Sequence, residues 1–212
     1  MSIKLLPAFL AAVLLLFPFQ AGTCQARAAV ESKAPAKTLD ANGFVKAAKK
    51  GEKGVVTTAL KNGQDPNVKD TDGNTALIEA AKEGRLEMAA LLIAHGASLN
   101  EGDAKFGGTP LIWAALNGRT EMVKLLLDKG ADLESRERLN GLTALLAAAV
   151  KGNTETVRFL LNKGAPVQTK DSEGRTALMW AANGGRTATV KLLLDRGATL
   201  EATEEDKGMN AL

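Results

Sequence analysis

Gly73-Asn74-Thr75-Ala76-Leu77 is a stretch of sequence that the chain repeats with few changes. Further copies begin at Gly107, Gly141 and Gly174, and a broken copy occupies Gly208-Met209-Asn210-Ala211-Leu212. The first glycines of successive copies lie 34, 34, 33 and 34 residues apart. A fixed period of this size indicates one supersecondary unit stacked on itself, so we expect function to reside on a surface rather than in a buried catalytic pocket.

The repeat from Asp70 to Asn100 shows what each unit contains. Its turn includes Gly73, and Thr75 follows as an N-cap whose hydroxyl can accept an amide hydrogen bond at the start of a first helix. Gly84 ends this helix, and a second helix is predicted over Leu86 to Ala94. Neither short helix can bury its apolar face alone, so stability is expected to come from the stack.

Several markers recur in phase, and together they closely resemble the ankyrin repeat. In one unit they are Thr109-Pro110-Leu111, Ala114-Ala115, Gly118 and Gly130-Ala131-Asp132. The resemblance implies an all-α solenoid over residues 40–212, with about five helix-turn-helix repeats, the first of them degenerate, and a C-terminal partial repeat. It also implies a non-catalytic module that binds another protein.

One departure from the family pattern is systematic. The family usually carries a histidine after Thr-Pro-Leu, where it tends to hydrogen-bond toward an adjacent repeat. Here the corresponding residues are Ile78, Ile112, Leu146 and Met179. We therefore expect apolar packing to replace that polar link between repeats.

The N-terminal segment has the features of a secretory signal peptide. Lys4 precedes an uncharged run from Leu5 to Phe19, which is shorter than the roughly 20 apolar residues that a membrane span needs. We predict a signal peptide over 1–28, cleaved after Ala28 or alternatively after Ala26, and a flexible leader over 29–39. The mature chain is then expected to be periplasmic in a bacterium, or secreted.

Cys24 is the only cysteine of the chain. Ala21-Gly22-Thr23-Cys24 has a partial similarity to the lipobox of bacterial lipoproteins, so a lipid anchor at Cys24 is an alternative to release. The motif normally carries Leu three residues before the cysteine and Gly or Ala just before it, and Ala21 and Thr23 depart from both. The anchored form is therefore disfavoured.

The formal net charge is +3, from 27 basic and 24 acidic residues. These charges are interspersed, whereas phosphate binding needs a face of one sign, so no nucleic-acid partner is predicted. A local excess of lysine occurs early in the folded part. We favour a polar end that keeps the solenoid soluble over a site for an acidic partner. These lysines are Lys46, Lys49, Lys50, Lys53 and Lys61.

The sequence offers little for catalysis. It has no tyrosine and one histidine, His95, which is predicted at the end of a second helix without an acid–base partner. Asp70-Thr71-Asp72-Gly73-Asn74 resembles the start of a calcium loop, but Ala81 stands where such a loop needs a glutamate. We predict no enzyme, no metal site and no cofactor.

The two middle repeats carry apolar residues in the turns and at the ends of the first helices, where ankyrin-like proteins tend to contact partners. The 34-residue spacings also lengthen both of their turns by one residue. An exposed apolar patch with a polar rim usually marks an interaction site, although the turns could instead bury these residues against each other. The predicted protein-binding residues are Lys105, Phe106, Trp113, Leu116, Leu139, Asn140, Leu142 and Val150.

Two alternatives stay open. Trp113 and Trp180 occupy matching places on first helices, and packing between repeats is favoured over a role as binding hot spots. The chain is also compatible with a self-associating scaffold. In that hypothesis a weak homo-oligomer forms through the last repeat, behind Val190 and Leu193, unless residues 202–212 cover that face as a lid.

Overall fold

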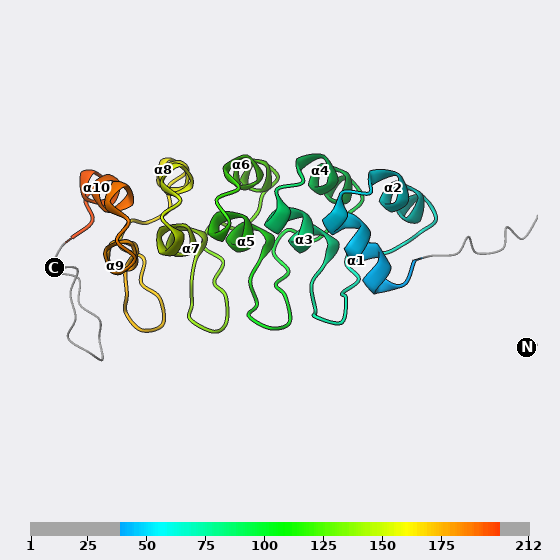
Figure 1. Ribbon diagram of the computed structural model, residues 1–212, viewed down its shortest axis with the longest axis horizontal. Coiled ribbons are helices and arrows are strands. Elements are labelled where there is room, and N and C mark those ends of the chain that lie inside the picture. The colour runs from blue at the N-terminus through cyan, green and yellow to red at the C-terminus, as the bar shows by residue number, and fades with distance from the viewer. Residues whose placement is uncertain (1–38, 200–212) are drawn as a thin grey trace, which may run out of the picture. The chain divides into compact units, whose positions relative to one another are not determined.

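The structure is a computed structural model that describes residues 39–199. The predicted signal peptide, almost all of the predicted leader and the partial repeat at Gly208 lie outside these residues. Within 39–199 the chain forms ten helices arranged in two layers (Figure 1). The layer of first helices contains α1 (Ala41–Lys50), α3 (Ala76–Glu83), α5 (Pro110–Leu116), α7 (Ala144–Lys151) and α9 (Ala177–Asn183). The layer of second helices contains α2 (Lys53–Lys61), α4 (Leu86–Ala94), α6 (Thr120–Asp128), α8 (Thr154–Asn162) and α10 (Thr187–Asp195).

This architecture confirms the predicted all-α solenoid of helix-turn-helix repeats. The predicted second helix over Leu86 to Ala94 is α4, with the same bounds. Gly84 follows α3 in a left-handed conformation that ends the helix. Pro110 occupies the first position of α5, where its missing N–H group is harmless.

A threonine caps every first helix from α3 to α9. Its hydroxyl accepts a hydrogen bond from the backbone N–H three residues later, as Thr75 does from Ile78 at 3.3 Å. This bond satisfies an amide that the helix itself leaves without a partner, and a cap of this kind contributes about 1 kcal/mol. The capping residues are Thr75, Thr109, Thr143 and Thr176.

The core consists of two rows of leucines that run through the stack at the repeat period. The row on the first helices is Leu77, Leu111, Leu145 and Leu178. The row on the second helices is Leu92, Leu126, Leu160 and Leu193. All eight are almost fully buried, and burial of each side chain stabilises the stack by about 1.5–3 kcal/mol. Small alanines beside them let adjacent first helices approach closely.

The positions that depart from the family pattern are buried, as expected. Polar links between repeats persist elsewhere, however, at the starts of the second helices. The hydroxyls of Thr120 and Thr156 lie 2.8 Å apart, and the Asn153 carboxamide donates to the Ala115 carbonyl at 2.9 Å. Apolar packing and these displaced links therefore act together. The buried residues in question are Ile78, Ile112, Leu146 and Met179.

At the two ends of the described stack, several charged side chains are paired and apolar side chains are at least partly covered. Three lysines of the N-terminal cluster form ion pairs: Lys49 with Glu79, Lys50 with Glu52 and Lys53 with Glu87. At the other end Leu193 is fully buried and Val190 is half-buried. These two residues therefore do not form an open apolar face, and pairing through the last repeat stays a prediction.

A glycine in the turn before α3, Gly73, allows this turn to lie close against the next one. Gly73 has a φ of 75°, and its backbone lies so close to the next turn that an added Cβ would come within 2.1 Å of the Ala104 Cβ. The close approach allows the Ala104 N–H to donate to the Gly73 carbonyl at 3.2 Å. Gly73 is thus required by both conformation and space.

We predict that Gly73→Ala destabilises the fold more than Gly63→Ala. Both residues have positive φ, so each substitution should cost about 1–2 kcal/mol of conformational strain. Only Gly73 has a neighbour in the way, because an added Cβ at Gly63 meets nothing within 4 Å. Overpacking should add about 1–3 kcal/mol at Gly73. Urea unfolding of both variants measures the difference, and equal losses would contradict the close approach.

Candidate protein-binding site

Four turns project from the layer of first helices (Figure 1). We call them finger A (69–75), finger B (102–109), finger C (136–143) and finger D (170–176). In each finger, the carboxylate of one acidic residue accepts hydrogen bonds from backbone N–H groups of the same finger. Asp103, for example, accepts from Phe106 at 2.7 Å and from Gly108 at 3.0 Å. A buried or half-buried carboxylate therefore sets the shape of every finger. The four carboxylates belong to Asp70, Asp103, Glu137 and Asp171.

Fingers B and C are longer than fingers A and D. In A and D the carboxylate residue precedes the capping threonine by five positions. Each of these fingers is closed by an isolated antiparallel β-bridge, Lys69 with Thr75 and Lys170 with Thr176. In B and C the separation is six positions. The extra residue lengthens the tips that carry Phe106 and Leu139, as the spacing of the repeats indicates.

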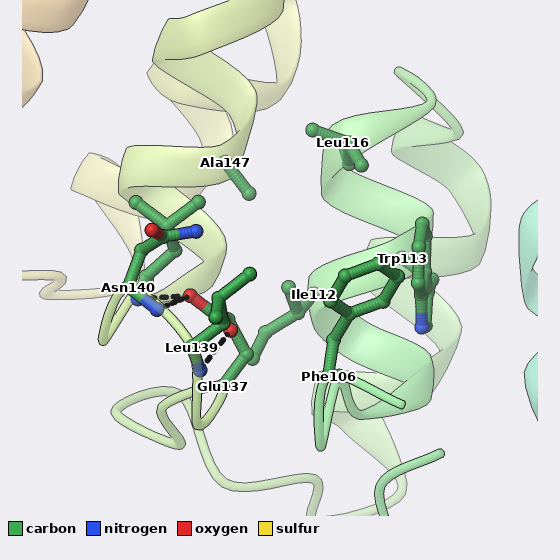
Figure 2. A pocket seen from close by; sticks show the side chains of 10 residues that line it. Phe106, Ile112, Trp113, Leu116, Glu137, Leu139, Asn140 and Ala147 are labelled. Carbon is green, nitrogen blue, oxygen red and sulfur yellow. Dashed lines mark hydrogen bonds between the residues drawn. The ribbon is translucent and has the colours of Figure 1, made fainter. Parts of the chain in front are cut away.

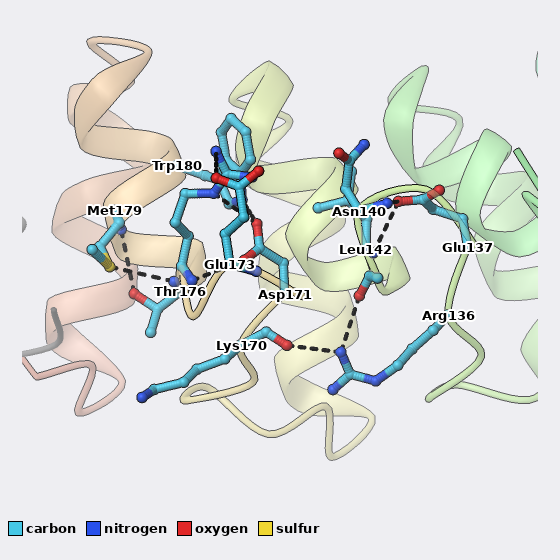
Figure 3. Close-up of polar contacts among 12 residues, drawn as sticks. Arg136, Glu137, Asn140, Leu142, Lys170, Asp171, Glu173, Thr176, Met179 and Trp180 are labelled. Atoms are coloured by element: carbon cyan, nitrogen blue, oxygen red, sulfur yellow. Dashed lines mark hydrogen bonds and ion pairs between the residues drawn. The ribbon is translucent and has the colours of Figure 1, made fainter. Parts of the chain in front are cut away.

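The finger carboxylate also binds a tryptophan in two of the repeats. The Trp113 indole N–H donates to Asp103 at 2.8 Å, and the Trp180 indole N–H donates to Asp171 at 2.9 Å (Figure 3). Both tryptophans lie four residues after the capping threonine and are half-buried. Each indole therefore anchors its finger to the first helix that follows.

Finger C lacks this anchor, because α7 carries Ala147 at the position of the two tryptophans. Its carboxylate belongs to Glu137 instead of an aspartate, and both oxygens accept from backbone N–H groups, at 2.7 Å from Leu139 and 2.6 Å from Asn140 (Figures 2 and 3). The longer glutamate side chain thus uses both oxygens for backbone N–H groups of the turn, and no indole binds it. The small Ala147 side chain leaves space beside α5 that a third tryptophan would occupy.

That space is an apolar pocket of about 190 Å³ between finger B with α5 and finger C with α7 (Figure 2). Phe106 and Trp113 form one wall, with their ring centroids 6.1 Å apart in an edge-to-face arrangement. Leu139 forms part of the opposite wall, and this residue is 64% exposed. The lining residues are Phe106, Gly108, Ile112, Trp113, Leu116, Glu137, Leu139, Asn140, Leu142 and Ala147.

The structure brings six of the eight predicted binding residues to this pocket. Lys105 lies outside the lining, with its ammonium 4.9 Å from the centre of the Phe106 ring. Val150 is half-buried on α7 and does not line the pocket. The six that share it are Phe106, Trp113, Leu116, Leu139, Asn140 and Leu142. Whether a partner binds them stays a prediction.

Sequence reasoning missed four of the lining residues: Gly108, Ile112, Glu137 and Ala147. The sequence predicts Ile112 only as a packing residue, whereas it is both buried and part of the pocket wall. A signal for the pocket was present in the repeats, since Ala147 interrupts a register that has Trp113 on one side and Trp180 on the other. Trp113 and Trp180 are neither fully buried in the core nor fully exposed to solvent.

Arginine side chains fix the spacing between neighbouring fingers. Arg138 in finger C donates to the Asp103 carbonyl of finger B at 2.9 Å. Arg136 donates to the Gly141 carbonyl at 3.0 Å and to the Lys170 carbonyl of finger D at 2.7 Å (Figure 3). Arg138 therefore links the two fingers that flank the pocket, and Arg136 fixes finger C against finger D.

Asp103 is the ionisable group that binds the aromatic wall of the pocket, through the Phe106 backbone and the Trp113 indole. Burial alone would raise the pKa of its carboxyl, but hydrogen bonds from the Phe106 backbone and the Trp113 indole, among others, outweigh that effect. Its pKa therefore lies below the ordinary value for aspartate. The carboxylate is charged at neutral pH and holds Phe106 and Trp113 in place.

We predict that Asp103→Asn lowers the free energy of unfolding at pH 7 by about 1.5–3 kcal/mol, because the neutral amide cannot replace both acceptor oxygens. The folded pKa is depressed, so this stability is fully present above the unfolded pKa of about 3.9 and is lost as the pH falls through the lower folded value. The gap between wild type and variant should therefore narrow below about pH 4. Chemical unfolding at several pH values measures it.

Asp72→Asn is the matched control, because Asp72 is exposed in finger A and its carboxylate accepts no hydrogen bond within the described residues. It should leave stability unchanged at every pH. A pH-independent loss in Asp103→Asn would show that the charge of the carboxylate is not what stabilises finger B.

Three further features of residues 39–199 concern metal ligands, membrane spans and the single histidine. This part of the chain contains no group of three or more His, Cys, Asp or Glu side chains placed to hold a metal ion. None of its helices combines the length and the apolar character needed to cross a membrane. His95 caps α4 and approaches the Leu91 carbonyl with Nδ1 at 2.9 Å, away from the pocket residues.

Comparison with known proteins agrees with this architecture. The family model described as ankyrin repeats in three copies matches residues 44–137 and 130–204. A search of curated proteins found no matching relative. The two matches together extend from α1 past α10 and cover more than half of the chain. The chain therefore belongs to the ankyrin-repeat family.

Proposed function

We propose that this protein is an exported, non-catalytic module that binds a partner protein through the face formed by its fingers and first helices in the middle repeats. Ankyrin repeats serve as protein–protein interaction modules, and the family is generally non-catalytic. The observation that carries the proposed location is the apolar pocket between fingers B and C.

The chemistry of this pocket supports a protein ligand. Its walls are aromatic and aliphatic, and residues of these kinds provide most binding energy where an interface core excludes water. Leu139 is 64% exposed and lies beside Phe106, Leu142 and the rest of the lining, so it extends an apolar patch of the kind that marks interaction sites. Arg136 and Arg138 hold the two fingers in place, so little ordering is needed when a partner binds.

We predict that Leu139→Ser reduces recovery of the partner at least about tenfold, as expected for a residue at the centre of an interface. Because Leu139 is exposed, the substitution should leave stability within about 0.5 kcal/mol of wild type. Crosslinking followed by affinity purification and quantitative mass spectrometry measures the recovery. The double variant Phe106→Ser with Leu142→Ser tests both walls together.

Leu86→Ser is the matched control. Leu86 is 40% exposed at the start of α4, in the layer of second helices, and does not line the pocket. It should retain full recovery of the partner. If wild type, Leu139→Ser and the double variant recover the same partner equally, the pocket is not the binding site.

The export of the chain is a separate part of the proposal and rests on the sequence of residues 1–28. We predict that the mature protein begins at Ala29, with Arg27 as the alternative start. Cell fractionation and N-terminal sequencing measure this directly. Cys24→Ser should be exported like wild type, because either cleavage removes Cys24. A membrane-bound form that depends on the Cys24 thiol would overturn release in favour of a lipid anchor.

A further inference from the structure

The charges at fingers B and C are sorted by depth. Asp103 and Glu137 are 2% and 6% exposed, and their oxygens accept hydrogen bonds from N–H groups. The basic side chains of the same fingers, Lys105, Arg136 and Arg138, are exposed. A molecule that approaches these fingers therefore meets positive charge at the surface and negative charge only behind backbone donors.

Three polar groups beside the pocket are available to a ligand. The Asn140 carboxamide forms no hydrogen bond with the described residues, and an amide can donate and accept at once, as a peptide backbone requires. The Lys105 ammonium forms no ion pair or hydrogen bond within the same part of the chain, and it lies over the Phe106 ring. Arg138 uses one of its terminal nitrogens for Asp103 and Ala104, which leaves other donors.

The size of the pocket limits what can enter it. At about 190 Å³ it lies below the roughly 300–1,000 Å³ of pockets that enclose whole small molecules. Its lining is apolar, and Leu139 at its edge is exposed to solvent. These dimensions fit one large apolar side chain of a longer segment better than a free metabolite or cofactor.

Resting on the proposed function, we propose that the partner presents an acidic segment whose single large apolar side chain enters this pocket. The segment lies across fingers B and C with its backbone near Asn140. Its carboxylates, placed beside the apolar anchor, meet Lys105 and the free donors of Arg138. Basic segments are rejected, because their charges would face three exposed cations, and neither finger carries an exposed acid.

Synthetic peptides test this inference on the full mature chain. Labelled nine-residue peptides carry a central Trp, Leu or Ala with either Glu or Lys on both sides, and fluorescence anisotropy measures their affinity. Glu-flanked Trp and Leu peptides should bind at least about tenfold more tightly than the Lys-flanked ones, and a central Ala should cost at least about tenfold. The preference should weaken as salt rises.

Matched variants locate the effect. Lys105→Glu should weaken the Glu-flanked peptides about three- to tenfold, whereas Lys191→Glu, an exposed lysine on α10, should have no effect. Ala147→Trp should abolish binding by filling the pocket with the residue that α9 carries at the same position. Leu139→Ser tests the same pocket independently of whether that tryptophan is accommodated.

The outcomes separate this inference from the proposed function. Equal affinity for Glu- and Lys-flanked peptides overturns the acidic segment, while the binding site stands if recovery of the natural partner still depends on Leu139. Peptide binding that survives both Ala147→Trp and Leu139→Ser overturns the inference. A dimer in sedimentation experiments that Leu139→Ser dissociates assigns the pocket to a second copy of the chain and also overturns it.

Discussion

Packing between repeats is the constraint on which the rest of the structure depends. The leucine rows of the first and second helices are almost fully buried only because each repeat lies against its neighbour at a constant spacing. Helices of seven to ten residues are too short to be stable alone in water. The stack therefore holds the helices, and the helices in turn fix where each finger begins and ends.

The fingers obtain their shape from a second, local interaction. Each finger carboxylate gathers N–H groups of its own turn, and arginines or backbone hydrogen bonds then join one finger to the next. This arrangement turns acidic groups inward and leaves basic ones outside in fingers B and C. Two positively charged tips beside an apolar pocket therefore follow from the hydrogen bonds that the turns require.

Much of the fold could be predicted because its signals are local. Thr75 before an apolar stripe and Gly84 after it define α3 without knowledge of any distant contact. The candidate site was harder to predict from the sequence. Five of its apolar residues and Asn140 could be predicted from the middle repeats, but Ala147 is small and buried, and nothing local to α7 indicates that its size opens a pocket.

The sequence by itself determined the period, the helices with their caps, the longer fingers B and C and the apolar character of their tips. These properties depend on residues within one repeat. Only the tertiary structure decided that Trp113 anchors to Asp103 and that Glu137 replaces such an anchor. It also decided that Phe106 and Leu139 face one space. Those outcomes depend on volumes and distances between adjacent repeats, which are established only when the repeats stack.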